Sequence, residues 1–184
     1  MTEQRETYGI DIAGIHRELE LFEIKPGLRI AILNILGDTE LVEACAKALA
    51  EKLADTEYDV LVTAEAKSIP IAYALSVVTG KPFAILRKSY KAYMGDAIAS
   101  ETLSITTGKP QTLYLDEKDR ALINGHKVVI VDDVISTGST LQGMRMIIEK
   151  AGGKVAAEAA ILTEGERAKW ADIIALGHLP VFSD

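Results

Sequence analysis

Residues 127–141, KVVIVDDVISTGSTL, are the stretch that decides the fold. Val128–Val131 is an unbroken apolar run rich in β-branched residues, which is typical of a central parallel strand with both faces buried. Asp132 and Asp133 follow at the carboxyl end of this predicted strand, and Ser136–Thr140 form a small polar turn. The apolar spacing from Leu141 to Ala151 then predicts a helix.

A strand, a hydroxyl-rich turn and a helix N-terminus together favour the binding of an anion. The free N–H groups of the turn and the helix dipole attract a phosphate, and the hydroxyl groups add donors. Asp132 and Asp133 cannot serve that phosphate because like charges repel, so they suit a polyol, a cation or a proton. A ribose 5-phosphate fits both halves of the stretch. The alternative is an ordinary strand-to-helix connection with Asp, Ser and Thr as turn and cap residues.

The run VVIVDDVISTGST resembles the phosphoribosyl diphosphate (PRPP) signature of type I phosphoribosyltransferases. In that family the paired acids hold the ribose hydroxyls, and the turn holds the 5-phosphate. The resemblance implies a PRPP site made of Asp132, Asp133, Ser136, Thr137, Gly138, Ser139 and Thr140. It also implies Mg²⁺ bound mainly by PRPP oxygens, with Asp132 or Asp133 assisting directly or through water.

The composition is that of one ordinary globular domain. The chain has 184 residues, of which 48% are hydrophobic and 26% charged, and a formal net charge of −7. This acidity argues against non-specific binding to nucleic acid or to an anionic membrane. We expect no membrane span and no signal peptide. Cys45 is the single cysteine, which excludes an internal disulfide and favours the cytoplasm; we expect it to be buried filler.

The rest of the chain alternates between predicted strands and helices. The patterns predict a hairpin within 7–36, helices at 39–54, 69–79 and a short one within 116–123, and strands at 59–64, 83–86, 112–115, 155–162 and 173–176, with 179–182 as a tail. This order predicts an α/β fold with a mostly parallel central sheet and helices on both faces. Residues 1–36 would form a small β-containing N-terminal lobe, and 37–184 the PRPP-binding core of a single domain.

Two further loops should meet the signature at the carboxyl ends of the strands. TAEAKS (63–68) resembles the pyrophosphate loop of purine phosphoribosyltransferases, and LRKSYKAYMG (86–95) resembles a basic segment of adenine, xanthine and archaeal hypoxanthine enzymes. The resemblance implies a pyrophosphate site made of Glu65, Ala66, Lys67, Ser68, Arg87, Lys88 and Lys91. The alternatives are a plain strand-to-helix turn and a solvated basic face.

The stretch 87–111 has no sustained period, which predicts a functional lid or flexible arm. Within it, Ser100–Lys109 resembles the flexible catalytic loop of adenine enzymes, although Thr106 stands where those enzymes often have a glutamate. Glu101 is the nearby candidate, with a solvated loop residue as the alternative. The N-terminal lobe corresponds to the hood that recognises the base in this family, and Asn34 stands about where xanthine enzymes use an asparagine.

These observations predict a purine phosphoribosyltransferase of nucleotide salvage, with adenine as the first choice of base. The predicted catalytic residues are Asp132, Asp133, Lys88, Arg87 and Glu101. A 6-oxopurine (hypoxanthine, xanthine or guanine) is the alternative base. A PRPP-sensing regulator with little catalysis and an orotate transferase are the alternative functions. The family is commonly dimeric, so the resemblance also implies a homodimer.

Overall fold

The computed structural model describes residues 5–103 and 110–183. In this part of the chain, a five-stranded sheet forms the centre of the molecule, and all of its neighbouring strands run parallel. Its order is β10 (Ile174–Leu179), β9 (Lys154–Glu164), β8 (Lys127–Ile135), β4 (Val60–Ala64) and β5 (Phe83–Leu86). The signature strand β8 is central, and Val128–Val131 are fully buried, as the sequence predicts.

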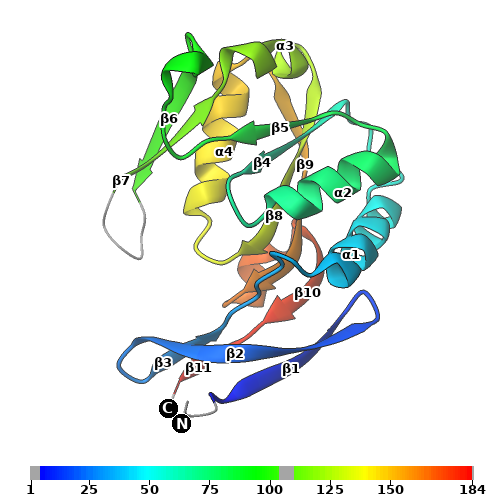
Figure 1. Ribbon diagram of the computed structural model, residues 1–184, viewed down its shortest axis with the longest axis vertical. Helices are drawn as coiled ribbons and strands as arrows, with labels where there is room; N and C mark the ends of the chain where they lie inside the picture. The colour runs from blue at the N-terminus through cyan, green and yellow to red at the C-terminus, as the bar shows by residue number, and fades with distance from the viewer. Residues whose placement is uncertain (1–4, 104–109, 184) are drawn as a thin grey trace.

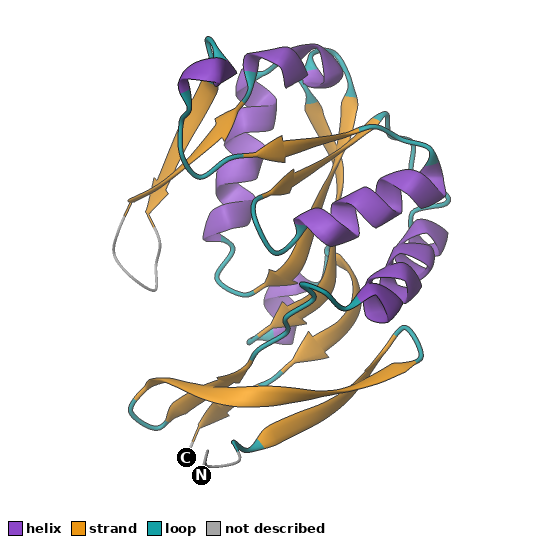
Figure 2. Cartoon of the chain, viewed as in Figure 1, coloured by secondary structure: helices purple, strands orange, loops and turns teal. Residues whose placement is uncertain are grey.

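Helices cover both faces of this sheet (Figure 2). On one face, α1 (Thr39–Lys52) and α2 (Ile69–Thr79) share a core with Val129 and Val131 of β8. On the other face, α4 (Ser139–Lys150) and the short α3 (Arg120–Ile123) pack on Val128 and Ile130. The side chains of β8 therefore alternate between two cores, which confirms the predicted fold class.

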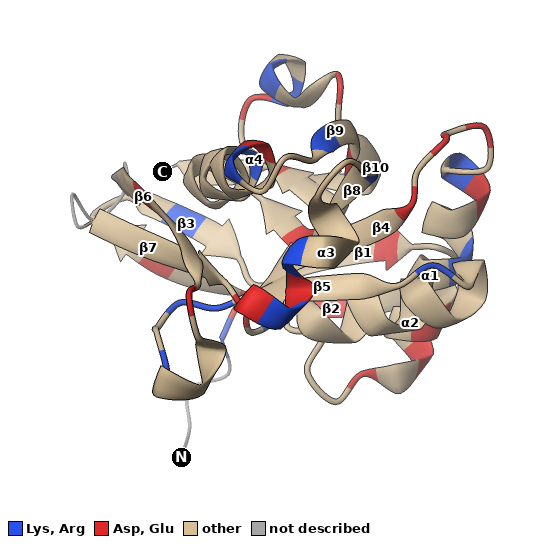
Figure 3. Cartoon of the chain, turned by 90° about the horizontal axis from the view of Figure 1, so that it is seen from above, with Lys and Arg blue, Asp and Glu red and all other residues tan. Residues whose placement is uncertain are grey.

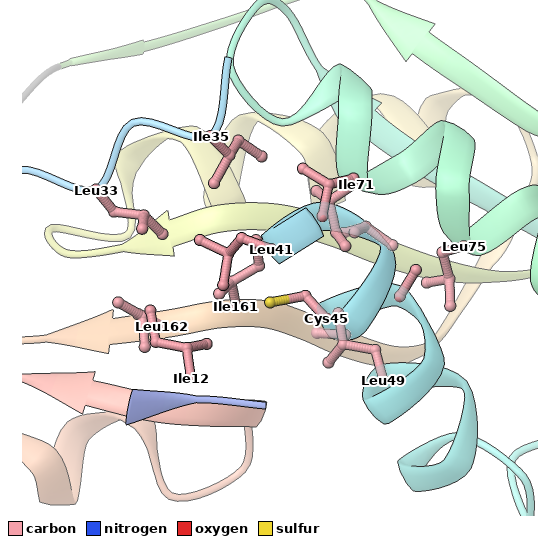
Figure 4. Packing of buried hydrophobic residues seen from close by; sticks show 14 of the residues in the cluster. Ile12, Leu33, Ile35, Leu41, Cys45, Leu49, Ile71, Leu75, Ile161 and Leu162 are labelled. Atoms are coloured by element: carbon pink, nitrogen blue, oxygen red, sulfur yellow. The ribbon is translucent and has the colours of Figure 1, made fainter. Parts of the chain in front are cut away.

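Figure 4 shows the first of these cores, where Cys45 of α1 points among Leu41, Leu49 and Ile161. Burial raises the pKa of the Cys45 thiol to about 12. A thiol with so high a pKa is a poor nucleophile, so Cys45 is filler in the core.

An antiparallel sheet forms a separate lobe beside the ends of the central strands (Figure 1). Its order is β1 (Thr7–Ile12), β2 (Ile15–Lys25), β3 (Leu28–Ala31) and β11 (Val181–Ser183). We call this lobe the hood. Its first three strands come from the predicted N-terminal lobe. The fourth comes from the far end of the chain, where the sequence indicates only a tail, and it covers the edge of β3.

The stretch 87–111, predicted to be an irregular arm, contains one strand of a β-hairpin, so that part of the prediction is wrong. The predicted strand at 112–115 is confirmed as part of the other strand of this hairpin. After a short 3₁₀ turn, η1 (Ala92–Met94), strand β6 (Ile98–Leu103) pairs with β7 (Pro110–Leu115). Ser100 and Thr102 of β6 and Leu113 of β7 are buried, and the hairpin packs on α4. A second 3₁₀ turn, η2 (Glu117–Asp119), leads into α3. Residues 104–109 of the predicted catalytic loop lie outside the described residues.

Charged residues of both signs are intermixed over the molecule rather than gathered on one side (Figure 3). Within the described residues, we find no helix with the length and apolar character needed to cross a membrane.

Candidate active site

The turn after β8 leads directly into the first turn of α4. Gly138 has a φ of +82°, a left-handed conformation that glycine adopts without strain, and α4 begins at Ser139. The helix thus starts two residues before the predicted Leu141, so Ser139 and Thr140 lie in its first turn, where N–H groups have no partner inside the helix. Thr137 Oγ1 and Ser139 Oγ are 3.1 Å apart. This phosphate turn (residues 136–140) lines a small hollow with a volume of about 40 Å³.

Asp132 and Asp133 form a buried acid pair just before this turn. Their exposed fractions are 9% and 7%. Asp132 Oδ1 accepts a hydrogen bond of 2.9 Å from the Asp133 N–H. Burial, and then the neighbouring charge of Asp133, raise the pKa of Asp132 to about 8. The charged form of Asp132 is therefore disfavoured in the absence of a ligand that stabilises it.

Lys67 joins the acid pair to the segment that connects the hood with the core. Its Nζ donates to the Leu33 carbonyl at 3.0 Å and lies 3.2 Å from Asp133 Oδ2. Lys67 belongs to the loop between β4 and α2, whose Glu65–Ala66 peptide bond is cis. The sequence predicts that Lys67 meets pyrophosphate, and the structure places its ammonium group beside Asp133 of the acid pair.

Ser68 acts within its own loop. Its hydroxyl donates to the Ala64 carbonyl at 2.6 Å and accepts from Thr63 Oγ1 at 2.8 Å. The residue is 3% exposed. Its side chain is therefore used to shape the turn, and what it can offer an anion is the backbone at the N-terminus of α2.

Glu65 organises the basic segment after β5. Its carboxylate accepts from Arg87 Nε at 2.5 Å and from the Lys88 N–H at 2.6 Å. Burial opposes ionisation, but these two partners outweigh it and lower the pKa of Glu65. Arg87 is also fixed by backbone hydrogen bonds of 2.8 Å in both directions with Tyr114 of β7. Glu65 thus acts as an anchor for the cations rather than as a direct anion ligand.

Comparison with known proteins agrees with this arrangement. The model of the phosphoribosyl transferase domain family matches residues 32–176. The chain belongs to this family. The match spans the acid pair, the phosphate turn, the Lys67 loop and the basic segment, and so confirms the family that the sequence predicts.

Relatives of this phosphoribosyl transferase domain have several roles. The chain is 31% identical over 143 residues to the purine biosynthesis transcriptional repressor of Bacillus subtilis, covering 78% of this chain and 49% of the repressor. It is 38% identical over 114 residues to a hypoxanthine/guanine phosphoribosyltransferase of Methanococcus maripaludis, covering 62% and 58% of the two chains. The chain thus spans about half of the length of these two relatives.

Two adenine phosphoribosyltransferases match over more of their length. The enzyme of Thermosipho africanus is 31% identical over 149 residues, covering 80% of this chain and 84% of the relative. The crystal structure of the enzyme of Thermoanaerobacter pseudethanolicus superposes with a TM-score of 0.68 at 23% identity, covering 94% and 95% of the two chains. The superposition on the Thermoanaerobacter pseudethanolicus enzyme shows that the two chains share a fold.

The remaining predicted residues of this phosphoribosyl transferase domain are exposed. Lys91 precedes η1. Glu101 lies in β6 opposite Thr112, between two buried residues, so it faces away from α4. Asn34 lines a hollow of about 390 Å³ between β2 and the hood–core connection, and its Oδ1 accepts from the Leu36 N–H at 3.2 Å. The roles given to these three residues stay predictions.

Trp170 is a site residue that the sequence analysis missed. It ends a 3₁₀ turn, η3 (Arg167–Trp170), between β9 and β10, and its ring lies against Gly138 of the phosphate turn. The two residues are far apart in sequence, and the parallel pairing of β8 with β9 brings them together. The one available signal was that Trp170 is the only tryptophan of the chain.

Proposed function

We propose that this chain transfers the 5-phosphoribosyl group of PRPP to a purine base, which gives a nucleoside 5-monophosphate and pyrophosphate. The observation that carries the proposal is the buried acid pair Asp132–Asp133 directly before the phosphate turn. Carboxylates accept hydrogen bonds from the 2- and 3-hydroxyls of a ribose, while the turn and the α4 N-terminus donate to its 5-phosphate. One ligand therefore satisfies both groups. Such an enzyme would recycle free purines.

The reaction exchanges one bond at ribose C1 for another. The bond from C1 to the pyrophosphate oxygen breaks, N9 of the purine bonds to C1, and the N9 proton is released. Positive charge grows on the ribose and negative charge on the pyrophosphate. Lys67, Arg87 and Lys88 are the cations of the site that would stabilise the leaving pyrophosphate, and Glu65 holds Arg87 and the Lys88 backbone in place for this purpose.

The carboxylates of Asp132 and Asp133 are suited to bind a Mg²⁺ ion that oxygens of PRPP also bind. Asp133 Oδ2 is buried and makes no hydrogen bond to any described residue, and the Lys67 ammonium lies 3.2 Å from it. Hard carboxylate oxygens suit Mg²⁺. Among the described residues, no cluster of three or more His, Cys, Asp or Glu could hold a metal without help. The ion would thus need PRPP oxygens together with Asp132 or Asp133, and when bound it would neutralise charge on the diphosphate.

We propose adenine as the first base, with hypoxanthine and guanine as the alternative. The adenine enzyme of Thermosipho africanus supports the first choice because it matches over most of its length. The archaeal hypoxanthine/guanine enzymes support the second. Asn34, in the hollow beside the hood, is the proposed contact to the base.

A PRPP-sensing regulator is the second candidate function. It is favoured by the 31% identity to the Bacillus subtilis repressor. A sensor would use the same acid pair and phosphate turn to bind PRPP without turning it over. Turnover therefore separates the two functions.

We also propose a homodimer. Tyr73, Val77 and Val78 of α2 are 59%, 64% and 47% exposed. Three apolar side chains exposed on one helix favour a protein partner, and a second copy is the partner that the family resemblance implies. Sedimentation equilibrium measures this directly, and the proposal predicts twice the mass of the chain.

The direct test incubates the protein with PRPP, Mg²⁺ and one base at a time, and identifies the product by chromatography. The proposal predicts adenosine monophosphate with adenine. Inosine or guanosine monophosphate alone would establish the alternative bases. If no base gives a nucleotide while PRPP binds in calorimetry, the chain is a sensor and the transferase proposal is wrong.

A further inference from the structure

Trp170 touches the phosphate turn at the residue that gives the turn its shape. A Cβ atom placed on Gly138 would lie 2.9 Å from Cη2 and 3.4 Å from Cζ3 of Trp170. The edge of the six-membered ring therefore packs directly against the glycine backbone. The ring itself is half-buried and packs against the core around α4.

The five-membered ring at the other end of the Trp170 indole is hydrogen-bonded to the central sheet. Trp170 Nε1 donates a hydrogen bond of 2.9 Å to the carbonyl of Glu164, the last residue of β9. The Ile173 N–H donates to the Trp170 carbonyl at 3.1 Å, which fixes the backbone of the turn. One side chain thus spans the distance from the end of β9 to the phosphate turn.

This contact limits the backbone freedom of Gly138. Glycine populates many conformations, and the loop it belongs to must keep its N–H groups aimed at one point to bind a phosphate. A ring edge packed on Gly138 restricts the alternatives before the ligand arrives, and an already ordered site loses less entropy on binding.

We propose that Trp170 is a positioning residue that holds the phosphate turn in its binding conformation. The proposal rests on the proposed function in one respect, namely that a ribose 5-phosphate group occupies the turn. Trp170 does not touch the reacting atoms. Its removal should therefore weaken PRPP binding and leave the chemical step and the binding of the base almost unchanged.

The experiment compares three variants with the wild type. Trp170→Ala removes the ring, Trp170→Phe keeps an aromatic edge without the N–H, and Lys169→Met removes the cation that lies 4.7 Å from the ring centroid. We expect Trp170→Ala to raise the KM for PRPP about three- to tenfold. Its kcat and its KM for the base should stay within about twofold, Trp170→Phe should recover most of the loss, and Lys169→Met should match the wild type.

Fluorescence gives a second readout that a merely structural role would not move. Because Trp170 is the only tryptophan, the emission of the wild type reports this ring alone. Saturating ribose 5-phosphate should shift that emission, and pyrophosphate should not. If Trp170→Ala does not fold, as judged by circular dichroism, this titration and Trp170→Phe decide the proposal.

The proposal is overturned if folded Trp170→Ala has the wild-type KM for PRPP, if Lys169→Met weakens binding as much, or if bound ribose 5-phosphate leaves the emission unchanged. These failures differ from failure of the proposed transferase. If no base reacts but ribose 5-phosphate shifts the emission and binds Trp170→Ala more weakly, Trp170 keeps its role in a sensor. If ribose 5-phosphate and PRPP both fail to bind the wild type, both proposals are wrong.

Discussion

Replacing Glu65 by Gln tests how the basic segment is held. The carboxylate of Glu65 accepts from Arg87 Nε at 2.5 Å and from the Lys88 N–H at 2.6 Å. A glutamine is almost the same size but keeps one acceptor oxygen, so its NH₂ group must face one of the two donors. A hydrogen bond to a charged group contributes about 1.5–3 kcal/mol. Because the side chains of Glu65 and Arg87 are 20% and 33% exposed, solvent lowers the expected loss of stability to about 1–2 kcal/mol.

This loss should be visible in both stability and binding. For a domain of this size we expect the Tm to fall by about 2–8 °C, and the KM for PRPP to rise up to about tenfold as Arg87 loses its orientation. The folded state lowers the pKa of Glu65. The stability that the ionised Glu65 carboxylate contributes is therefore fully present at pH values above its ordinary pKa of 4.5. It is lost as the pH falls from 4.5 through the lower pKa of the folded state, so the free energies of unfolding of the wild type and Glu65→Gln should converge in acid.

A double-mutant cycle with Arg87→Met isolates the pair. Urea unfolding of the wild type, the two single variants and the double variant should give a coupling free energy of about 1–2 kcal/mol. Glu20→Gln is the matched control, because Glu20 pairs with Arg5 on the hood with both side chains more than half exposed. It should change stability by less than about 1 kcal/mol and leave PRPP binding unchanged. Additive effects of Glu65→Gln and Arg87→Met would refute the reasoning.

Three further predictions concern single residues. Ribose hydroxyls that donate to Asp132 favour its charged form, so PRPP binding should release a proton and tighten as the pH rises toward the pKa of about 8. Calorimetry in two buffers of different ionisation enthalpy measures the released proton. Asp132→Asn should abolish this proton release. Asp38 caps α1 through the Leu41 N–H at 3.2 Å and pairs with Arg17 Nε at 2.8 Å, so Asp38→Ala should lower the free energy of unfolding in urea by about 2 kcal/mol. Because Arg17 lowers the pKa of Asp38, the difference in stability between the wild type and the variant should shrink in acid. An unchanged difference would contradict the assignment of this cap and ion pair. Cys45 should react with a thiol reagent only as fast as the protein unfolds, because it is buried and its pKa is about 12; rapid reaction of the folded protein would be the contrary result.

Local patterns were sufficient for the core of the fold. The apolar run of β8 and the proline-to-glycine boundaries of α2 follow from rules that act over a few residues, and the structure places α2 at Ile69–Thr79 as predicted. Strand β6 was missed for a physical reason, whereas residues 112–115 of its partner β7 were predicted as a strand. Ser100 and Thr102 occupy the buried face of β6 against α4, so the alternation of polar and apolar residues that marks a strand is absent.

The site was predictable where one segment carries it. The acid pair and the phosphate turn are contiguous, so their position at the end of a buried strand and the start of a helix could be predicted from the sequence. Lys67 on Asp133 and Trp170 on Gly138 are contacts between distant segments, and they depend on how the strands of the sheet are ordered. No local pattern contains that order.

The measurement that tests the central claim most directly is pyrophosphate release from PRPP and Mg²⁺ with adenine, hypoxanthine, guanine, xanthine or orotate, run in parallel for the wild type and Asp133→Asn. The account predicts release with a purine by the wild type and a rate reduced about a hundredfold or more in the variant, with circular dichroism unchanged. Release by Asp133→Asn at the wild-type rate, or no release by the wild type with any purine, would contradict it.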